Sequence, residues 1–119
     1  MKILRQLMTK PAGIFDDISE KCVWYEAHDQ NGCFAFIALW FYENNTHAEL
    51  HLKINRWSPT IAKLCKTQGM DEIRAECRKR GVKILVAGNP DVKDKRWPKF
   101  IQMMGFDEPK LFYSSIMEV

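Results

Sequence analysis

The chain has 119 residues, of which 46% are hydrophobic, so it can bury the core of one compact domain and has little room for a second. Its 18 basic and 15 acidic residues leave a net charge of +3, which argues against nucleic acid as a partner. The four cysteines form no Cys-x-x-Cys pair, a pattern that favours buried free thiols over a metal site or a disulfide framework. The basic start has an apolar run too short for a signal peptide or a membrane span, so we expect a cytoplasmic protein.

The first forty residues predict a strand, a short helix and a hairpin. A loosely alternating stretch over residues 1–10 favours a strand over a frayed helix, and the apolar residues of 14–21 recur at helical spacing. Residues 22–28 and 33–42 are rich in aromatic and apolar side chains, and Asn31-Gly32 between them is a strong hairpin-turn signal. Because the arm 33–42 is apolar on both faces, we expect a central strand that is covered on both sides.

The middle of the chain predicts a strand and a long helix. Residues 47–55 alternate between apolar and polar side chains, and this period of two fits a half-buried strand. Ser58 suits a helix N-cap and Pro59 the first helical position, where the missing amide hydrogen of proline would have no partner. We expect the helix to run to about Arg80, before Gly81. Its expected core face, weakened at Gln68-Gly69, consists of Ile61, Leu64, Cys65, Ile73 and Cys77.

The last forty residues hold the most informative order of elements. The aliphatic run 82–87 predicts a buried strand, which is followed by a loop with Asn89 and by a short helix around Phe100 that ends at Gly105-Phe106. Residues 111–119 predict a last strand. A strand that carries an Asn, followed by a helix that closes on Gly-Phe, resembles the C-terminal half of the GNAT fold of N-acetyltransferases.

From residue 22 to the end, the whole order of elements resembles the GNAT fold, while the region before it is shorter than in that family. The resemblance implies a single α/β (α+β) domain over residues 1–119. Its mixed, mostly antiparallel sheet would be flanked by helices in the order β-α-β-β-β-α-β-α-β. Between residues 47 and 106 the likeness extends to the lengths of the elements.

The resemblance implies acetyl-CoA as cofactor. The family holds the pyrophosphate on backbone amides at the start of its long helix, where a Gln or Arg precedes two spaced glycines. This motif falls on residues 56–61, in which Arg56 fits, whereas Pro59 and Ile61 stand at the glycine positions. The alternative is a well-capped helix without a ligand. The candidate cofactor-binding residues are Arg56, Trp57, Ser58, Thr60 and Asn89.

Glu49 and His51, on the polar face of the strand 47–55, are the candidate catalytic residues, because either could act as general base for an amine. The alternative is that both are solvated side chains on a half-covered strand. The family often uses a Tyr on its last helix as acid, but Ile101 stands at that place and cannot donate a proton. No metal is expected, and His28 and His47 at the turn edges have no metal-binding pattern around them.

Two functions follow from these residues. The first is an acetyl-CoA-dependent N-acetyltransferase whose acetyl group lies in the gap between the strands 47–55 and 82–87. The second is a non-catalytic protein of the same fold that acts through protein contacts. Trp57, Gly88-Asn89 and Ile101 resemble the small GNAT-like proteins of some tailed bacteriophages. That resemblance implies a phage origin and a role in the virion or on a host protein, with the partner and the amine substrate left open.

Overall fold

The computed structural model describes residues 2–15, 21–42, 46–88, 96–107 and 114–119. Six strands form one sheet whose spatial order is the order of the sequence. They are β1 (Leu4–Leu7), β2 (Val23–Asp29), β3 (Gly32–Phe41), β4 (His47–Ile54), β5 (Ile84–Gly88) and β6 (Ser114–Glu118). Neighbouring strands run antiparallel except β4 and β5, which run parallel. The predicted α+β fold with a mixed, mostly antiparallel sheet is therefore confirmed.

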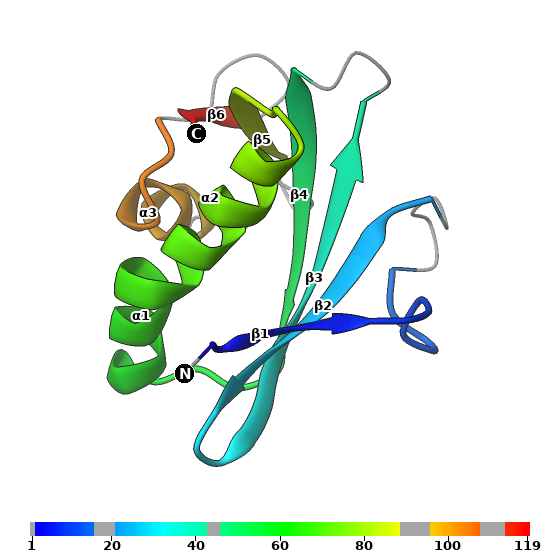
Figure 1. Ribbon diagram of the computed structural model, residues 1–119. Coiled ribbons are helices and arrows are strands. Elements are labelled where there is room, and N and C mark those ends of the chain that lie inside the picture. The colour runs from blue at the N-terminus through cyan, green and yellow to red at the C-terminus, as the bar shows by residue number, and fades with distance from the viewer. Residues whose placement is uncertain (1, 16–20, 43–45, 89–95, 108–113) are drawn as a thin grey trace.

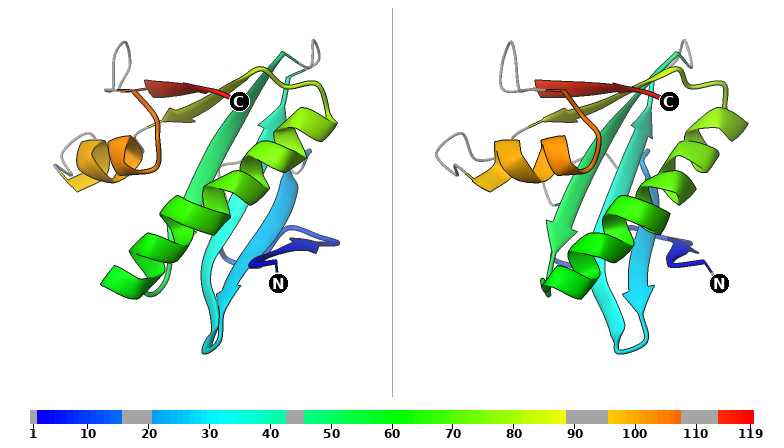
Figure 2. Two further views of the ribbon diagram at one scale, coloured as in Figure 1. Left: turned by 60° about the vertical axis from the view of Figure 1, so that its left-hand side comes forward. Right: turned by 90° about the vertical axis from the view of Figure 1, so that its left-hand side faces the viewer.

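The helices lie on one face of this sheet (Figures 1 and 2). They are α1 (Pro59–Leu64), the π-helical turn η1 (Cys65–Gly69), α2 (Met70–Lys79) and α3 (Arg96–Met103). The first three follow one another without a break and form the long helix that the sequence predicts. Its start is confirmed as well, because the Ser58 hydroxyl accepts a hydrogen bond from the Ile61 amide at 3.1 Å. None of the described helices is both long and apolar enough to cross a membrane.

The π turn inside the long helix repairs a break in the apolar pattern. In an α-helix the side chain seven residues after Cys65 would share its face, but that position is Glu72 and the apolar residue is Ile73, one place later. The turn over Cys65–Gly69 absorbs this extra residue. Ile61 and Ile73 can therefore both face the sheet, and they are 3% and 4% exposed. The expected weak point at Gln68-Gly69 lies within this turn.

The main core lies between the helices and the sheet. Alternate residues of the strands meet the apolar faces of the long helix and α3; buried members include Ile37, Leu39, Leu50, Ile61, Ile73, Cys77, Leu85 and Ile101. A smaller cluster of Cys22, Trp24 and Ala38 lies on the opposite face of the sheet. Within the described residues no helix covers this opposite face, which we call the helix-free face (Figure 1).

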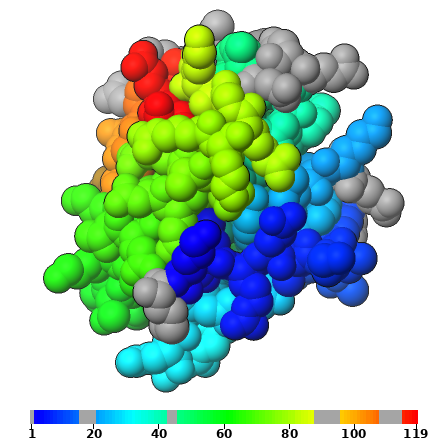
Figure 3. Space-filling view, in the orientation of Figure 1, coloured from blue at the N-terminus to red at the C-terminus, as the bar shows by residue number. Residues whose placement is uncertain are grey.

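The N-terminal strand is anchored to the long helix by one carboxylate. Both Glu72 oxygens accept hydrogen bonds from the Ile3 amide, at 3.0 and 3.1 Å, and one of them also accepts from the Leu4 amide at 3.0 Å. Gln68 donates to the same carboxylate at 3.0 Å. Figure 3 shows the first residues, in blue, against the green surface of the long helix. These charge-assisted bonds join two segments 68 and 69 residues apart in the sequence.

Two expectations need correction. The predicted helix over 14–21 does not begin at its described residues, because Phe15 has a φ of 58° and so cannot start a right-handed helix. Its ring instead packs on Trp24 with 5.7 Å between ring centroids, while residues 16–20 lie outside the described part. The strand β3 is not covered along both faces, since Trp40 on the helix-free face is 37% exposed.

Removing the Glu72 carboxylate tests the anchor of the N-terminal strand. Because Glu72→Ala leaves two backbone amides without their partner, we expect the free energy of unfolding to fall by about 1–3 kcal/mol. Amide hydrogen exchange at Ile3 and Leu4 should accelerate most. Asp71→Ala, one residue away with a side chain that is 73% exposed, is the control and should leave both amides protected. Unchanged exchange at Ile3 and Leu4 in Glu72→Ala would contradict the assignment.

Candidate functional site

The strands β4 and β5 are paired over only part of their length. Their register runs from His47 opposite Ile84 to Leu50 opposite Ala87. β4 continues to Ile54, whereas β5 ends at Gly88, and the residues from 89 to 95 lie outside the described part. Beyond Leu50 the β4 backbone therefore has no described β5 partner. The gap that the sequence led us to expect between these strands can open only beyond this point.

Glu49 lies at the centre of a polar network on the helix-free face. The Tyr42 hydroxyl donates to Glu49 Oε2 at 2.8 Å, and His51 Nε2 lies 2.8 Å from Glu49 Oε1. The His51 and Glu49 side chains are 27% and 26% exposed, so the network is accessible to solvent. Glu49 faces Val86 within the paired stretch, while His51 is the next residue on this face and lies past the last pair. The two candidate catalytic residues are thus in contact, at the place where the described β4–β5 pairing ends.

Aromatic rings form one wall of this network. The Trp40 ring stacks on Tyr42 with 5.2 Å between centroids, and His47 meets Tyr42 edge-on at 6.4 Å. Burial, followed by the hydrogen bond to Glu49, raises the pKa of Tyr42, so its hydroxyl remains a donor at neutral pH.

The Cys22 thiol is also buried, and burial together with the Glu49 charge raises its pKa. Cys22 is therefore a poor nucleophile.

The start of the long helix fits a pyrophosphate poorly. Ser58 already caps the helix through the Ile61 amide, and Pro59 offers no amide hydrogen. The Ile61 side chain is buried, and Thr60 is exposed. Of the expected cofactor ligands here, Ser58 and Thr60 lie together at this helix start, without the close backbone approach that glycines would permit.

Arg56 points to a different partner from the one that the motif implies. Its guanidinium binds Asp29 at 2.7 and 3.3 Å and the Gly32 carbonyl oxygen at 3.2 Å. Asp29 and Gly32 form the ends of the β2–β3 hairpin turn. This hydrogen-bonded ion pair holds the pKa of Asp29 below its ordinary value. Arg56 therefore stabilises the β2–β3 hairpin turn in this structure.

Trp57 bridges the start of the long helix and α3. Its ring packs edge-on against Phe100 with 5.5 Å between centroids, and Phe100 in turn packs on Trp97 at 5.5 Å. Trp57 is 47% exposed, so one side of the ring remains open to a ligand or a partner. Behind these rings lies a cavity of about 40 Å³ with an entirely apolar lining, which includes Leu52, Ile54 and Phe100. It is much smaller than the roughly 300–1,000 Å³ of typical ligand pockets.

Ile101, at the position of the family's acid, is fully buried and cannot reach solvent. Asn89 lies outside the described residues. In the part of the chain that is described, no four potential metal ligands come together, although one group of three does.

Known proteins resemble the chain in structure. No protein-family model matches it, and neither does any curated protein. Aminoglycoside 6'-acetyltransferase type Ii matches with a TM-score of 0.62 and 17% identity, over 82% of this chain and 69% of that one. The GNAT domain of S. lividans PAT matches with a TM-score of 0.61 and 14% identity, over 83% of this chain and 61% of that one. The chain has the GNAT fold.

A third structure extends the range of substrates on this fold. Ribosomal-protein-alanine N-acetyltransferase from Brucella melitensis matches with a TM-score of 0.58 and 15% identity, over 82% of this chain and 69% of that one. The chain spans roughly two thirds of the length of these three proteins. Because one GNAT fold serves acceptors as different as an aminoglycoside and a ribosomal protein, the fold alone does not choose a substrate.

Sequence reasoning missed Tyr42 and Asp29. Tyr42 is the last residue of the predicted strand 33–42, and its hydroxyl donates to Glu49 across the β3–β4 turn. A signal existed, because Tyr42 and Glu49 flank a short turn between antiparallel strands and must lie close together. Asp29 gave no such signal, since its partner Arg56 is 27 residues away.

The pH dependence of stability tests the Asp29–Arg56 pair. A carboxyl whose pKa is lowered in the folded state stabilises the fold above its unfolded pKa, which is about 3.9, and this stabilisation is lost as the pH falls through the folded value. We expect Asp29→Asn to have a lower Tm than the parent chain at pH 7. The difference should shrink as the pH falls below about 4. The control is Asp71→Asn, which breaks the exposed pair with Arg74 and should change the Tm little at any pH. If the Tm of Asp29→Asn remains below that of the parent chain at pH 2, the assignment is refuted.

Proposed function

We propose that the chain is an N-acyltransferase that takes its acyl group from acetyl-CoA and passes it to an amine. The observation that carries this proposal is the Tyr42–Glu49–His51 network at the point where the described pairing of β4 with β5 ends. The fold supports it, because solved structures with the same fold are named as acetyltransferases. The poor fit at the helix start implies weak affinity for the cofactor.

Glu49 would act as the base. Its carboxylate takes a proton from the acceptor amine, directly or through a water molecule, while Tyr42 and His51 hold its two oxygens in place. Acetyl-CoA, if bound, would supply the thioester carbonyl as acyl donor and the CoA thiolate as leaving group. The β4 backbone beyond Leu50 lacks a described β5 partner, so its peptide groups are the natural place to align the acyl donor.

Ile101 contributes no acid catalysis to the leaving group, because it has no proton to give. The thiolate would take its proton from solvent or from another group. Rate enhancement then rests mainly on holding the two substrates together, which can be worth several orders of magnitude. We therefore infer a modest turnover that depends strongly on Glu49.

The second candidate is a non-catalytic protein of the same fold that acts through protein contacts. It is favoured by the cofactor end of the site, where Arg56 is engaged by Asp29, Pro59 lacks an amide hydrogen and Trp57 packs on Phe100. The exposed side of Trp57 is the contact surface that this candidate would use. A phage origin, with a role in the virion or on a host protein, belongs to this second candidate.

Replacing the carboxylate tests the catalytic assignment. Release of the CoA thiol from acetyl-CoA is followed with an aminoglycoside and with a peptide bearing an N-terminal alanine as trial acceptors. Because Glu49→Gln keeps the shape but cannot take a proton, we expect turnover to fall by about 10²–10⁴-fold. Glu76→Gln, which also removes a carboxylate bonded to a tyrosine hydroxyl but lies on the long helix, should keep the parent rate. Equal rates in the parent chain and Glu49→Gln would remove Glu49 from the mechanism.

A thermal titration separates the two candidate functions. If acetyl-CoA binds the folded chain, the Tm rises with ligand concentration, and the stabilisation reaches about 2.7 kcal/mol at one hundred times Kd. Pro59→Ala, which regains an amide hydrogen at the helix start, should increase the shift at equal ligand concentration. No shift in either chain at millimolar acetyl-CoA would leave the non-catalytic candidate.

A further inference from the structure

A β-bulge gathers three metal-binding side chains on the helix-free face. Opposite Ala27 and His28 stand Ala35 and Cys33, so Phe34 is one extra residue in β3. In a regular strand, side chains two residues apart point to the same face, and Ala35 and Leu39 point toward the helices. Without the bulge at Phe34, Cys33 would therefore point toward the helices as well. The bulge instead buries Phe34, which is 1% exposed, and places Cys33 opposite His28.

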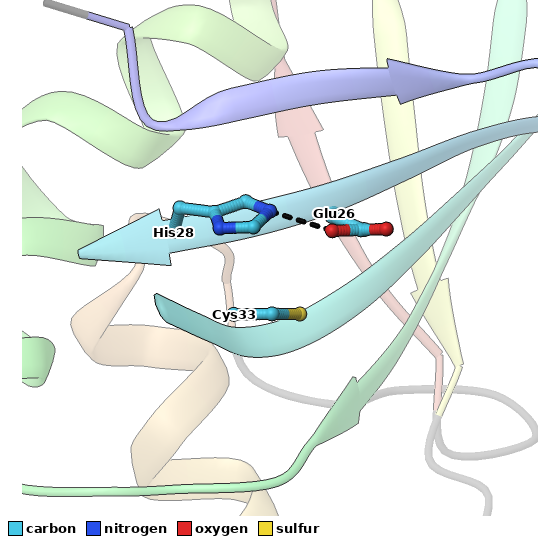
Figure 4. A group of neighbouring side chains, drawn as sticks. All are labelled: Glu26, His28 and Cys33. Atoms are coloured by element: carbon cyan, nitrogen blue, oxygen red, sulfur yellow. Dashed lines mark hydrogen bonds and ion pairs between the residues drawn. The ribbon is translucent and has the colours of Figure 1, made fainter. Parts of the chain in front are cut away.

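The three donor atoms are already close together. The His28 and Cys33 ligand atoms and a Glu26 carboxylate oxygen all lie within 4.8 Å of one another (Figure 4). His28 Nε2 is 2.6 Å from Glu26 Oε2, and Cys33 Sγ makes a 3.5 Å contact with the Ala35 carbonyl oxygen. Around a tetrahedral zinc with Zn–N near 2.0–2.1 Å and Zn–S near 2.3 Å, ligand atoms lie about 3.3–3.8 Å apart. Small side-chain rotations are enough to reach that spacing.

The surroundings suit a cation bound by three ligands. The His28 and Glu26 side chains are 23% and 25% exposed, so the site is reachable from solvent yet partly sheltered by the sheet. The nearby Arg56 guanidinium is held by Asp29 and by the Gly32 carbonyl oxygen. The Asp29 charge offsets much of the repulsion between this guanidinium and a bound metal cation. All three ligands come from one hairpin whose register is set by the Asn31-Gly32 turn, so binding would need no rearrangement of the fold.

We propose that Glu26, His28 and Cys33 form a binding site for a divalent transition-metal cation of the zinc class, with a fourth position open to water or to a ligand from outside. One thiolate, one imidazole and one carboxylate are the donor types that zinc and cobalt share. On binding, the Cys33 thiol releases its proton to solvent, the His28 ring keeps its proton on Nδ1 so that Nε2 is free to ligate, and two metal–ligand bonds replace the Glu26–His28 hydrogen bond. The site is separate from the Tyr42–Glu49–His51 network and does not depend on acyl transfer.

Cobalt is the sharpest probe of this site, because only a thiolate ligand gives Co²⁺ a charge-transfer band in the near ultraviolet. Titration of the metal-free parent chain with Co²⁺ should produce this band at one equivalent, and added Zn²⁺ should abolish it. Cys33→Ala should lose the band. Since even outer-shell partners of a metal are worth 10–100-fold in affinity, we expect Cys33→Ala and His28→Gln each to weaken Zn²⁺ binding at least tenfold.

Two control variants guard against adventitious binding. Cys65→Ala removes a different thiol, and His47→Gln removes a different imidazole; neither belongs to the three-residue group. Both should keep the parent band and the parent Zn²⁺ affinity. The proposal is overturned if the parent chain shows no thiolate band with Co²⁺, or if Cys33→Ala and Cys65→Ala lose affinity equally. Folding of each variant is checked by its thermal transition in the presence of chelator.

Discussion

The parallel contact between β4 and β5 is the constraint on which the rest of the molecule depends. It extends over four residue pairs, His47–Ile84 to Leu50–Ala87, and then stops. Parallel neighbours need a long crossover, and here the long helix supplies it and packs back on the sheet. Beyond Leu50 the β4 backbone has no described β5 partner, and this is the region assigned to the acyl donor. Leu52 and Ile54 of the same stretch line the apolar cavity together with residues of the long helix and α3.

The two faces of the sheet carry different kinds of chemistry. On the helix side the described residues near the end of the β4–β5 pairing are apolar: Leu52, Ile54, Trp57 and Phe100 all line the small cavity. On the helix-free face the same strands present two carboxylate–histidine pairs, Glu49–His51 and Glu26–His28. The first is held by a tyrosine and lies where the described β4–β5 pairing ends, whereas the second lies beside a thiol near the hairpin turn. The same kind of carboxylate–histidine pair is therefore assigned two different roles, because the residues around each pair differ.

Much of the architecture could be predicted from local sequence, because the decisive signals are short-range. The alternation over 47–55, the Ser58-Pro59 helix start and the Asn31-Gly32 turn each act within a few residues, and the structure contains all three. What failed or was missed depends on distant partners. Arg56 fits a phosphate motif by spacing, yet Asp29 occupies its guanidinium. The grouping of Cys33 with His28 required knowledge of the bulge, and the apolar pattern of 33–42 does not locate it. Glu49 and His51 could be paired by their spacing alone, and the short turn between β3 and β4 also gave a signal for Tyr42, which donates to Glu49.

Two places in the fold accommodate one surplus residue each, the bulge at Phe34 in β3 and the π turn at Cys65–Gly69 in the long helix. A surplus residue in a strand reverses the inside and outside positions that follow it, and one in a helix turns them by about 100°. An ungapped alignment with a relative that lacks either residue would therefore match core positions with surface positions over the remainder of that element. Shape survives such insertions far better than residue-by-residue likeness does. This is one physical reason why a chain can superpose on distant enzymes although its sequence identity to them is low.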